Sequence, residues 1–189
     1  MNTFQESQAL CANEVLSDDD LILNLGSPSW IVRHDAYTAL QARGQAVLEA
    51  AIRGLRHPNP VIRRYAADLM DHLGNDVCVP PLLDLLNDPV PNVRRQAVHS
   101  LSCQRCKATP LSVNMTDILI DKMLNDPNQR VRGEAAFGLY LLPLPAKPAV
   151  ISAFEQALAE CMADLQPSKA VNIYVRFLRK TLARMQRSI

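Results

Sequence analysis

The chain has 189 residues, of which 48% are apolar and only 5% are aromatic, and its formal net charge is +1. This length suits one globular domain or a short repeat array, and the scarcity of aromatic residues favours packed helices over a β-sandwich. A net charge near zero argues against nucleic-acid binding through a strong overall field.

The charged residues are unevenly distributed. The first twenty residues carry acidic side chains and no basic one, whereas residues 166–189 carry basic side chains and no acidic one. The N-terminus lacks the features of a signal peptide, and the longest apolar run, residues 137–146, is too short to cross a bilayer. Five cysteines without such a signal predict free thiols in a reducing compartment. We therefore expect a cytoplasmic protein without a transmembrane segment.

Residues 1–26 form the first predicted segment, an acidic stretch that ends in a short capping helix. Ser17 precedes three aspartates, and this order predicts a helix start: the serine caps the helix, and the acids lie at the positive end of its dipole. We expect this helix to end at Gly26.

Residues 27–142 form the second segment, in which the pattern predicts pairs of helices. The first helix of each pair, helix A, begins near a proline, because proline fits the first turn of a helix. We expect A helices at 29–43, 60–73, 91–102 and 129–142. The second helices, B, are expected at 45–56, 77–87 and 116–125, with a loop at 103–114. Residues 143–189 form the third segment, a C-terminal cap of two helices at 147–164 and 168–187.

Four prolines mark a repeat, with spacings of 30, 31 and 38 residues; the last spacing holds a seven-residue insertion. The residues at fixed offsets after each proline are conserved in type, and such periods indicate an array of helical hairpins. The prolines are Pro28, Pro58, Pro89 and Pro127. Offset +4 holds Val32, Ile62, Val93 and Val131; +5 holds Arg33, Arg63, Arg94 and Arg132; +8 holds Ala36, Ala66, Ala97 and Ala135; +12 holds Leu40, Met70, Leu101 and Leu139.

Each offset suggests a structural role. The residues at +4 and +12 share one helix face and are expected in the core, and the small alanine at +8 lets two helices approach closely. Asp88 and Asp126, which precede two of the prolines, are expected to cap the A helices. The arginines at +5 are expected to pair with acids of their own or a neighbouring unit, as a ladder along the array; we favour this structural role over ligand binding.

The pattern Asp-Pro-x-x-x-Val-Arg-x-x-Ala-x-x-x-Leu resembles HEAT repeats of the short bacterial type, the HEAT-like repeats named after phycobilisome bilin lyases. The resemblance covers residues 27–142. It implies an all-α fold, a right-handed α-solenoid (superhelix) of armadillo-like helical hairpins, with helices A on the convex side and helices B on the concave side. Family members mostly act as scaffolds, adaptors or binding subunits.

Enzymatic branches of this family fit the sequence less well. Deoxyhypusine hydroxylases hold iron with His-Glu pairs, and none of the four histidines here is followed by glutamate. DNA glycosylases with such repeats use an aromatic and acidic pocket on a basic face, whereas this chain has a single tryptophan, Trp30, and a near-neutral middle. Bilin lyase subunits offer no motif that can be transferred residue by residue, so this branch stays open.

The most reactive-looking stretch lies in the predicted loop, where Cys103 and Cys106 form a Cys-x-x-Cys pair one helical turn after His99. These three residues could bind zinc, with Cys78 as a fourth ligand, or the two cysteines could form a redox pair. Because a closed zinc site usually shows a second short-spaced Cys/His pair and none is present, we favour two ordinary thiols and expect no metal or other cofactor.

Basic residues suggest candidate partner-binding surfaces. The last helix is either a solvated cap, as the end of a solenoid requires, or a docking face for an acidic partner, RNA or an anionic membrane. Arg64 and Arg95 recur at matching positions and could be exposed in a row. In the last helix the candidates are Arg176, Arg179, Lys180, Arg184 and Arg187.

No Ser-His-Asp arrangement or phosphate-binding glycine loop is apparent, so no catalytic residue is assigned and a non-enzymatic role is favoured. We expect a scaffold or adaptor that binds a protein partner through the concave surface of its B helices, as a monomer or weak homo-oligomer. One alternative is a bilin lyase-like or cofactor-handling subunit that acts on another protein. A weaker one is nucleic-acid binding through the basic last helix.

Overall fold

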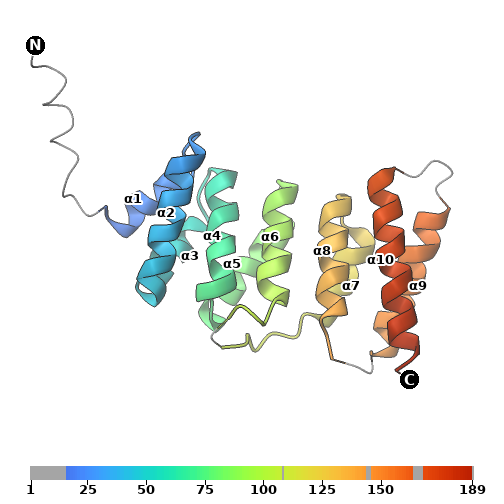
Figure 1. The fold of residues 1–189 in the computed structure, drawn as a ribbon. Coiled ribbons are helices and arrows are strands. Elements are labelled where there is room, and N and C mark those ends of the chain that lie inside the picture. The colour runs from blue at the N-terminus through green and yellow to red at the C-terminus, as the bar shows by residue number, and fades with distance from the viewer. Residues whose placement is uncertain (1–15, 108, 144–145, 164–167, 189) are drawn as a thin grey trace, which may run out of the picture.

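The computed structural model of the chain describes residues 16–107, 109–143, 146–163 and 168–188; most of the acidic N-terminal stretch lies outside these ranges. Within them the chain forms ten α-helices, three short 3-10 helices and no strand. Figure 1 shows the even-numbered helices side by side in one layer and the odd-numbered helices in a second layer behind them. The fold is therefore an α-solenoid, as the repeat predicts.

The helices agree closely with the predicted A and B elements. The even-numbered helices are α2 (Trp30–Arg43), α4 (Pro60–Leu73), α6 (Pro91–Ser102), α8 (Gln129–Tyr140) and α10 (Lys169–Gln186). The odd-numbered helices are α1 (Asp18–Asn24), α3 (Leu48–Gly54), α5 (Val79–Asp84), α7 (Thr116–Asn125) and α9 (Pro148–Met162). The 3-10 helices Gly44–Val47, Asp76–Cys78 and Leu85–Asn87 complete the predicted B elements.

Each odd-numbered helix packs against the even-numbered helix that follows it, and neighbouring even-numbered helices also pack against one another. The turn that contains each repeat proline thus connects an odd-numbered helix to the even-numbered helix that packs against it. Between α6 and α7 the described residues form no helix, which confirms the predicted loop.

The core follows the repeat offsets. All four alanines at +8 and all four residues at +12 are buried, as predicted. At +4 the prediction holds for Ile62, Val93 and Val131 but is wrong for Val32, which is 38% exposed. The reason is its place at the end of the array: the preceding helix α1 has only seven residues, and no even-numbered helix precedes α2 among the described residues.

Two of the four arginines at +5, Arg63 and Arg94, form the predicted ladder, whereas the described contacts of Arg33 and Arg132 are to backbone carbonyls. Arg63 donates to both carboxylate oxygens of Asp88 at 2.7 and 3.1 Å, and Arg94 binds Asp126 in the same way at 2.8 and 2.9 Å. Each arginine also donates to the carbonyl of the residue before its own proline, as Arg94 does to Asp88 at 2.8 Å. The carboxylate always belongs to the following unit, so each pair joins two successive repeats.

The predicted capping role of these aspartates is wrong. Helix α8 begins after Asn128, whose side chain accepts the capping hydrogen bond from the Arg130 N–H. Asp126 lies two residues earlier and accepts from the Asn128 N–H at 2.8 Å, which fixes the turn instead. Asp88 does the same for Val90. The turn residue after the proline separates the aspartate from the helix start, so its carboxylate can face the arginine.

The start of α1 confirms the predicted cap. Ser17 and Asp20 form a reciprocal capping box. The neighbouring aspartates bind basic residues of later helices: Asp18 pairs with Arg43 and Asp19 pairs with Arg53 at 2.7 Å. These pairs tie α1 to α2 and α3. Among the described residues, no helix combines the length and apolar character that crossing a membrane requires.

Candidate functional site

Arg64 and Arg95 do not form the exposed row that the sequence suggested. Both side chains are partly buried. The Arg64 guanidinium lies over the ring of Tyr65, 4.0 Å from its centroid, and the buried Nε of Arg95 has no hydrogen-bond partner among the described residues. The Arg64 guanidinium thus packs against Tyr65, and both arginines are less exposed than the sequence suggested.

The basic residues of α10 divide into two groups. Arg176, Lys180 and Arg187 are exposed. Arg184 is partly buried: it donates to the Tyr140 carbonyl at 3.0 Å, and its guanidinium lies 4.5 Å from the centroid of the Tyr140 ring. Arg179 is exposed and contacts the sulfur of Met162 at 3.3 Å. Arg184 therefore anchors α10 to α8, while the exposed residues remain available on the surface.

An open apolar groove of about 340 Å³ lies between α8 and α10. Phe137 on α8 and Ile173 on α10 are 41% and 62% exposed, although both are large apolar side chains. The sequence pattern missed Ile173 because it lies on the helix face that carries the basic residues. The residues that line the groove include Arg130, Gly133, Phe137, Ile173, Tyr174 and Phe177.

The surroundings of this groove are positively charged. Arg130 lines it directly, and Arg176 and Lys180 follow Ile173 by three and seven residues, which places them on the same face of α10. Helix α10 contains no acidic residue. By contrast, α3, α5 and α7 expose no large hydrophobic side chain among the residues described. Within the predicted B elements, the 3-10 helix Asp76–Cys78 contributes one exposed large hydrophobic side chain, Val77.

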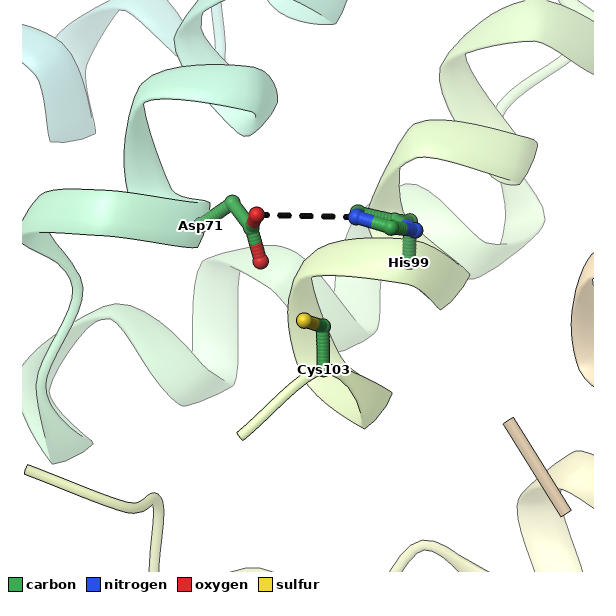
Figure 2. Close-up of side chains that lie close together, drawn as sticks. All are labelled: Asp71, His99 and Cys103. Carbon is green, nitrogen blue, oxygen red and sulfur yellow. Dashed lines mark ion pairs between the residues drawn. The ribbon is translucent and has the colours of Figure 1, made fainter. Parts of the chain in front are cut away.

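A second candidate site lies at the insertion loop, where three helices contribute polar side chains. His99 on α6 stands between two carboxylates: its Nδ1 is 2.8 Å from Glu134 of α8, and its Nε2 is 3.5 Å from Asp71 of α4. The hydrogen bonds to Asp71 and Glu134 raise the pKa of His99 to about 10. Figure 2 shows Asp71, His99 and Cys103 pointing toward one another.

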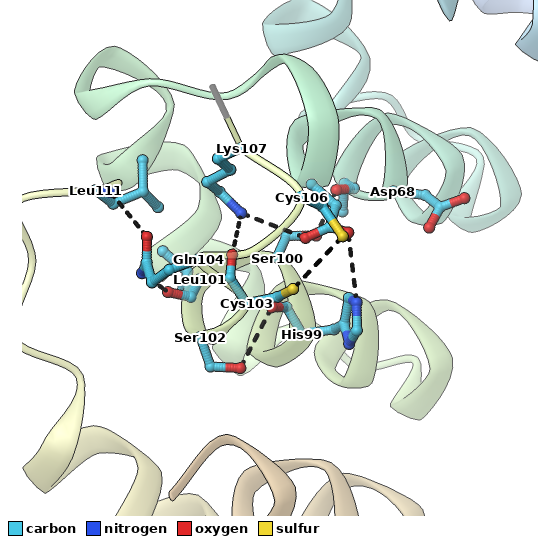
Figure 3. A network of polar contacts seen from close by, with 12 residues as sticks. Asp68, His99, Ser100, Leu101, Ser102, Cys103, Gln104, Cys106, Lys107 and Leu111 are labelled. Carbon is cyan, nitrogen blue, oxygen red and sulfur yellow. Dashed lines mark hydrogen bonds and ion pairs between the residues drawn. The ribbon is translucent and has the colours of Figure 1, made fainter. Parts of the chain in front are cut away.

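A buried lysine completes this cluster. The Lys107 ammonium is fully buried, 3.3 Å from Asp71 Oδ1, and donates to the Cys103 carbonyl at 2.8 Å. Burial tends to raise the pKa of Asp71, but the hydrogen bond from His99 and the charge of Lys107 outweigh it and hold that pKa below its usual value. Figure 3 shows how Lys107 and Gln104 fasten the loop to the end of α6.

The two loop cysteines lie close together, with their sulfur atoms 3.7 Å apart. Cys103 is buried and Cys106 is exposed. The hydrogen bond to Cys103 and the charge of Asp71 raise the pKa of Cys106 to about 11, so this thiol is a poor nucleophile at neutral pH. The redox interpretation of the pair therefore gains no support from its surroundings.

The structure thus brings together His99, Cys103 and Cys106, as the spacing suggested, and adds residues that the spacing could not reveal. Asp71 and Glu134 lie 28 and 35 residues from His99 in the chain and reach it only because neighbouring even-numbered helices pack side by side. Cys78 is engaged elsewhere: its buried thiol donates to the Asn75 carbonyl at 2.8 Å.

Comparison with known proteins agrees with the repeat geometry. Residues 48–139 match the family model of HEAT repeats. The chain is a HEAT-repeat protein. No curated protein sequence matches this HEAT-repeat protein.

Two solved structures are similar to this chain, and the first of them shows the same kind of fold. A chain in the complex of CpcE and CpcF of phycocyanin lyase from Nostoc sp. PCC7120 matches this HEAT-repeat protein with a TM-score of 0.66 and 19% identity, over 88% of this chain and 99% of that chain. A designed armadillo repeat protein in complex with the peptide (KR)4 matches with a TM-score of 0.46 and 14% identity, over 90% of this chain and 88% of that chain. At 19% identity the similarity to the chain of the CpcE–CpcF complex concerns the fold alone.

Proposed function

We propose that this HEAT-repeat protein is a non-enzymatic scaffold that binds an acidic, amphipathic segment of a partner protein in the groove between α8 and α10. The observation that carries the proposal is the exposure of Phe137 and Ile173 in an open groove that is bordered by basic side chains. Isolated exposed hydrophobic residues are ordinary, but a groove that gathers them beside one sign of charge is typical of a binding surface.

Both parts of the surface have a physical role in this proposal. Burial of Ile173 and Phe137 against an apolar face of the partner supplies affinity, about 25 cal/mol for each Å² of apolar surface removed from water. Acidic residues on the rim of the partner segment then face Arg130, Arg176 and Lys180, which speeds association and fixes orientation. An amphipathic helix in a groove is a common form of such recognition.

The alternatives find less support in the described surface. Docking on the B helices would find no exposed large hydrophobic side chain on α3, α5 or α7, and only Val77 on the described 3-10 helices beside them. Nucleic-acid binding would account for the basic side chains, because affinity for phosphates comes from cations. It would not account for the exposed apolar side chains of the groove. A role like that of phycocyanin lyase rests on a similarity in fold to a chain of the CpcE–CpcF complex, which is itself an assembly of two proteins.

Site-specific crosslinking tests the proposal. A photo-crosslinking amino acid at position 173 is introduced into the full chain in its source cells, and the captured species is identified by mass spectrometry. The matched control carries the same amino acid in place of Val77, which is 68% exposed near α5. We expect one protein with an acidic segment to be captured at 173 and not at 77.

Titration of each variant with the identified partner then separates the apolar and the electrostatic contributions to affinity. Ile173→Gln is expected to weaken binding about tenfold or more, since central apolar contacts dominate interfaces. Lys180→Glu is expected to weaken binding most at low salt, whereas Arg56→Glu, the same charge change on an exposed residue outside the groove, leaves binding unchanged. Equal affinity of wild type and Ile173→Gln, or capture of nucleic acid in place of protein, contradicts the proposal.

A further inference from the structure

The polar cluster at the insertion loop contains four side chains that are typical zinc ligands. Asp71 is at the C-terminal end of α4, His99 is in the last turn of α6, Cys103 follows α6 directly, and Cys106 lies three residues further on. One ligand atom each of Asp71, His99 and Cys103 lie within 4.8 Å of one another, and Asp71 and Cys106 form a second group of this kind with the exposed His72.

We propose that Asp71, His99, Cys103 and Cys106 bind one zinc ion. In a tetrahedral zinc site, bonds to sulfur of about 2.3 Å place two sulfur atoms about 3.8 Å apart, and bonds to nitrogen and oxygen of about 2.1 Å place those atoms about 3.4 Å apart. The two sulfur atoms of this cluster are 3.7 Å apart, and His99 Nε2 is 3.5 Å from Asp71 Oδ2. Two edges of the tetrahedron are thus already formed.

The residues around the four ligands support the same assignment. Glu134 holds His99 Nδ1 at 2.8 Å, which orients the ring so that Nε2 faces Asp71. A carboxylate in this position is the usual outer partner of a zinc-bound histidine. Lys107 binds Asp71 through Oδ1 and leaves Oδ2 directed at His99.

The buried lysine offsets part of the charge that the zinc ligands bring together. Zinc with two thiolates and the Asp71 carboxylate carries one net negative charge, which the ammonium of Lys107 compensates, and the Glu134 carboxylate leaves the whole cluster with one net negative charge. Binding releases the protons of both thiols and of His99 Nε2 to the solvent. All four ligands come from the protein, so the site is structural rather than catalytic, and it fixes the insertion loop to α4 and α6.

Metal titration tests this assignment on the full chain. The protein is stripped with a chelator under reducing conditions and titrated with Co²⁺, which reports tetrahedral geometry and thiolate ligands through its visible and near-ultraviolet bands. We expect one equivalent of Co²⁺ with both signatures, displaced by Zn²⁺. Cys106→Ser weakens the thiolate band; because Cys106 is exposed, this change leaves the core intact. The control Cys161→Ser leaves both signatures unchanged.

Two further variants test the individual roles. Asp71→Asn weakens Zn²⁺ binding because a charged ligand is lost, and Glu134→Gln weakens it about 10- to 100-fold through the orientation of His99. Three outcomes overturn the proposal: the reduced wild type takes up neither ion; Cys106→Ser binds as tightly as wild type; or Cys78→Ala abolishes binding while Asp71→Asn does not. Circular dichroism of each variant verifies that it folds.

Discussion

Close approach between helices depends on single residues, and α8 contains two glycines with opposite surroundings. A Cβ on Gly138 would lie 2.9 Å from the Cβ of Ser102 and 3.1 Å from Cδ1 of Leu119, whereas a Cβ on Gly133 would meet no atom within 4 Å. Both positions lie inside the same helix, so they differ in packing rather than in backbone conformation.

Alanine at these two positions is therefore expected to change stability in opposite directions. Gly133→Ala should raise the free energy of unfolding by about 0.5–1 kcal/mol, because alanine is the better helix former. Gly138→Ala should lower it, by about 1–3 kcal/mol if Ser102 and Leu119 cannot move away. Urea unfolding followed by circular dichroism measures both, and a gain for Gly138→Ala would show that α6 and α8 separate readily.

Asp126 makes stability depend on pH. Burial tends to raise its pKa, but the hydrogen bonds from Arg94 and from the Asn128 N–H outweigh burial and hold the pKa below its usual value. A carboxylate whose pKa is lower in the folded state stabilises the fold above its unfolded pKa of about 3.9, and this contribution is lost as pH falls through the folded pKa.

The loss of stability between about pH 5 and pH 2 should consequently be smaller in Asp126→Asn than in wild type, although the variant is less stable at neutral pH. Urea unfolding at several pH values checks this expectation. Asp20→Asn, which changes an exposed carboxylate of the capping box in α1, serves as the comparison away from the ladder. Parallel pH profiles for wild type and Asp126→Asn would exclude the ladder as a source of acid sensitivity.

Successive elements are joined by buried ion pairs. In the pair of Arg94 and Asp126, the side chains are 10% and 2% exposed, whereas both partners of the Arg53 and Asp19 pair lie largely in solvent. A buried charge that loses its partner keeps its cost of desolvation. The ladder pairs are thus expected to matter far more than the surface pair.

Arg94→Met is expected to lower the free energy of unfolding by about 3–5 kcal/mol, because Asp126 would remain buried without a counter-charge. Arg53→Met should leave stability nearly unchanged, since exposed pairs contribute little. Thermal unfolding of both variants makes the comparison. If Arg94→Met with Asp126→Ala is no more stable than Arg94→Met alone, the stranded carboxylate is not the source of the loss.

At the scale of the whole molecule, the helices of the array are expected to differ in the free energy of local unfolding. Both ladder pairs join units that contain α4, α6 and α8. Arg33 on α2 donates only to the carbonyls of Ser27 and Pro28 among its described contacts, and the position that holds an aspartate in later units is His57. The N-terminal unit therefore lacks the joint that links the middle ones.

Amide hydrogen exchange is expected to be slowest in α4, α6 and α8 and faster in α2, because repeat arrays open unit by unit from their weaker end. Mass spectrometry of exchanged peptides measures the gradient. Replacement of His57 with Asp gives Arg33 a carboxylate and should slow exchange in α2. Equal protection along the whole chain would mean that the array unfolds as one cooperative block.

The sequence predicted the features that repeat and missed those that do not. The offsets from proline identified most of the core and the two arginine–aspartate pairs of the middle units, because the same contacts recur there. Asp71 and Glu134 occupy no recurring offset, so only the packing of α4, α6 and α8 reveals that they flank His99. Ile173 was missed for a related reason: its neighbours on α10 are basic, and a helix face with charges is normally solvated.

The arginine–aspartate pairs also bear on how the array could gain a repeat. The segment from Asp88 to Asn125 contains Asp88, which pairs with Arg63 of the preceding unit, and Arg94, which pairs with Asp126 of the following unit. A tandem copy inserted after Asn125 would offer its aspartate to Arg94 and its own arginine to Asp126, so every joint would be complete. Duplication of this one gene segment is thus enough to lengthen the protein, whereas a copy of the unit that begins at His57 would leave an arginine without a carboxylate.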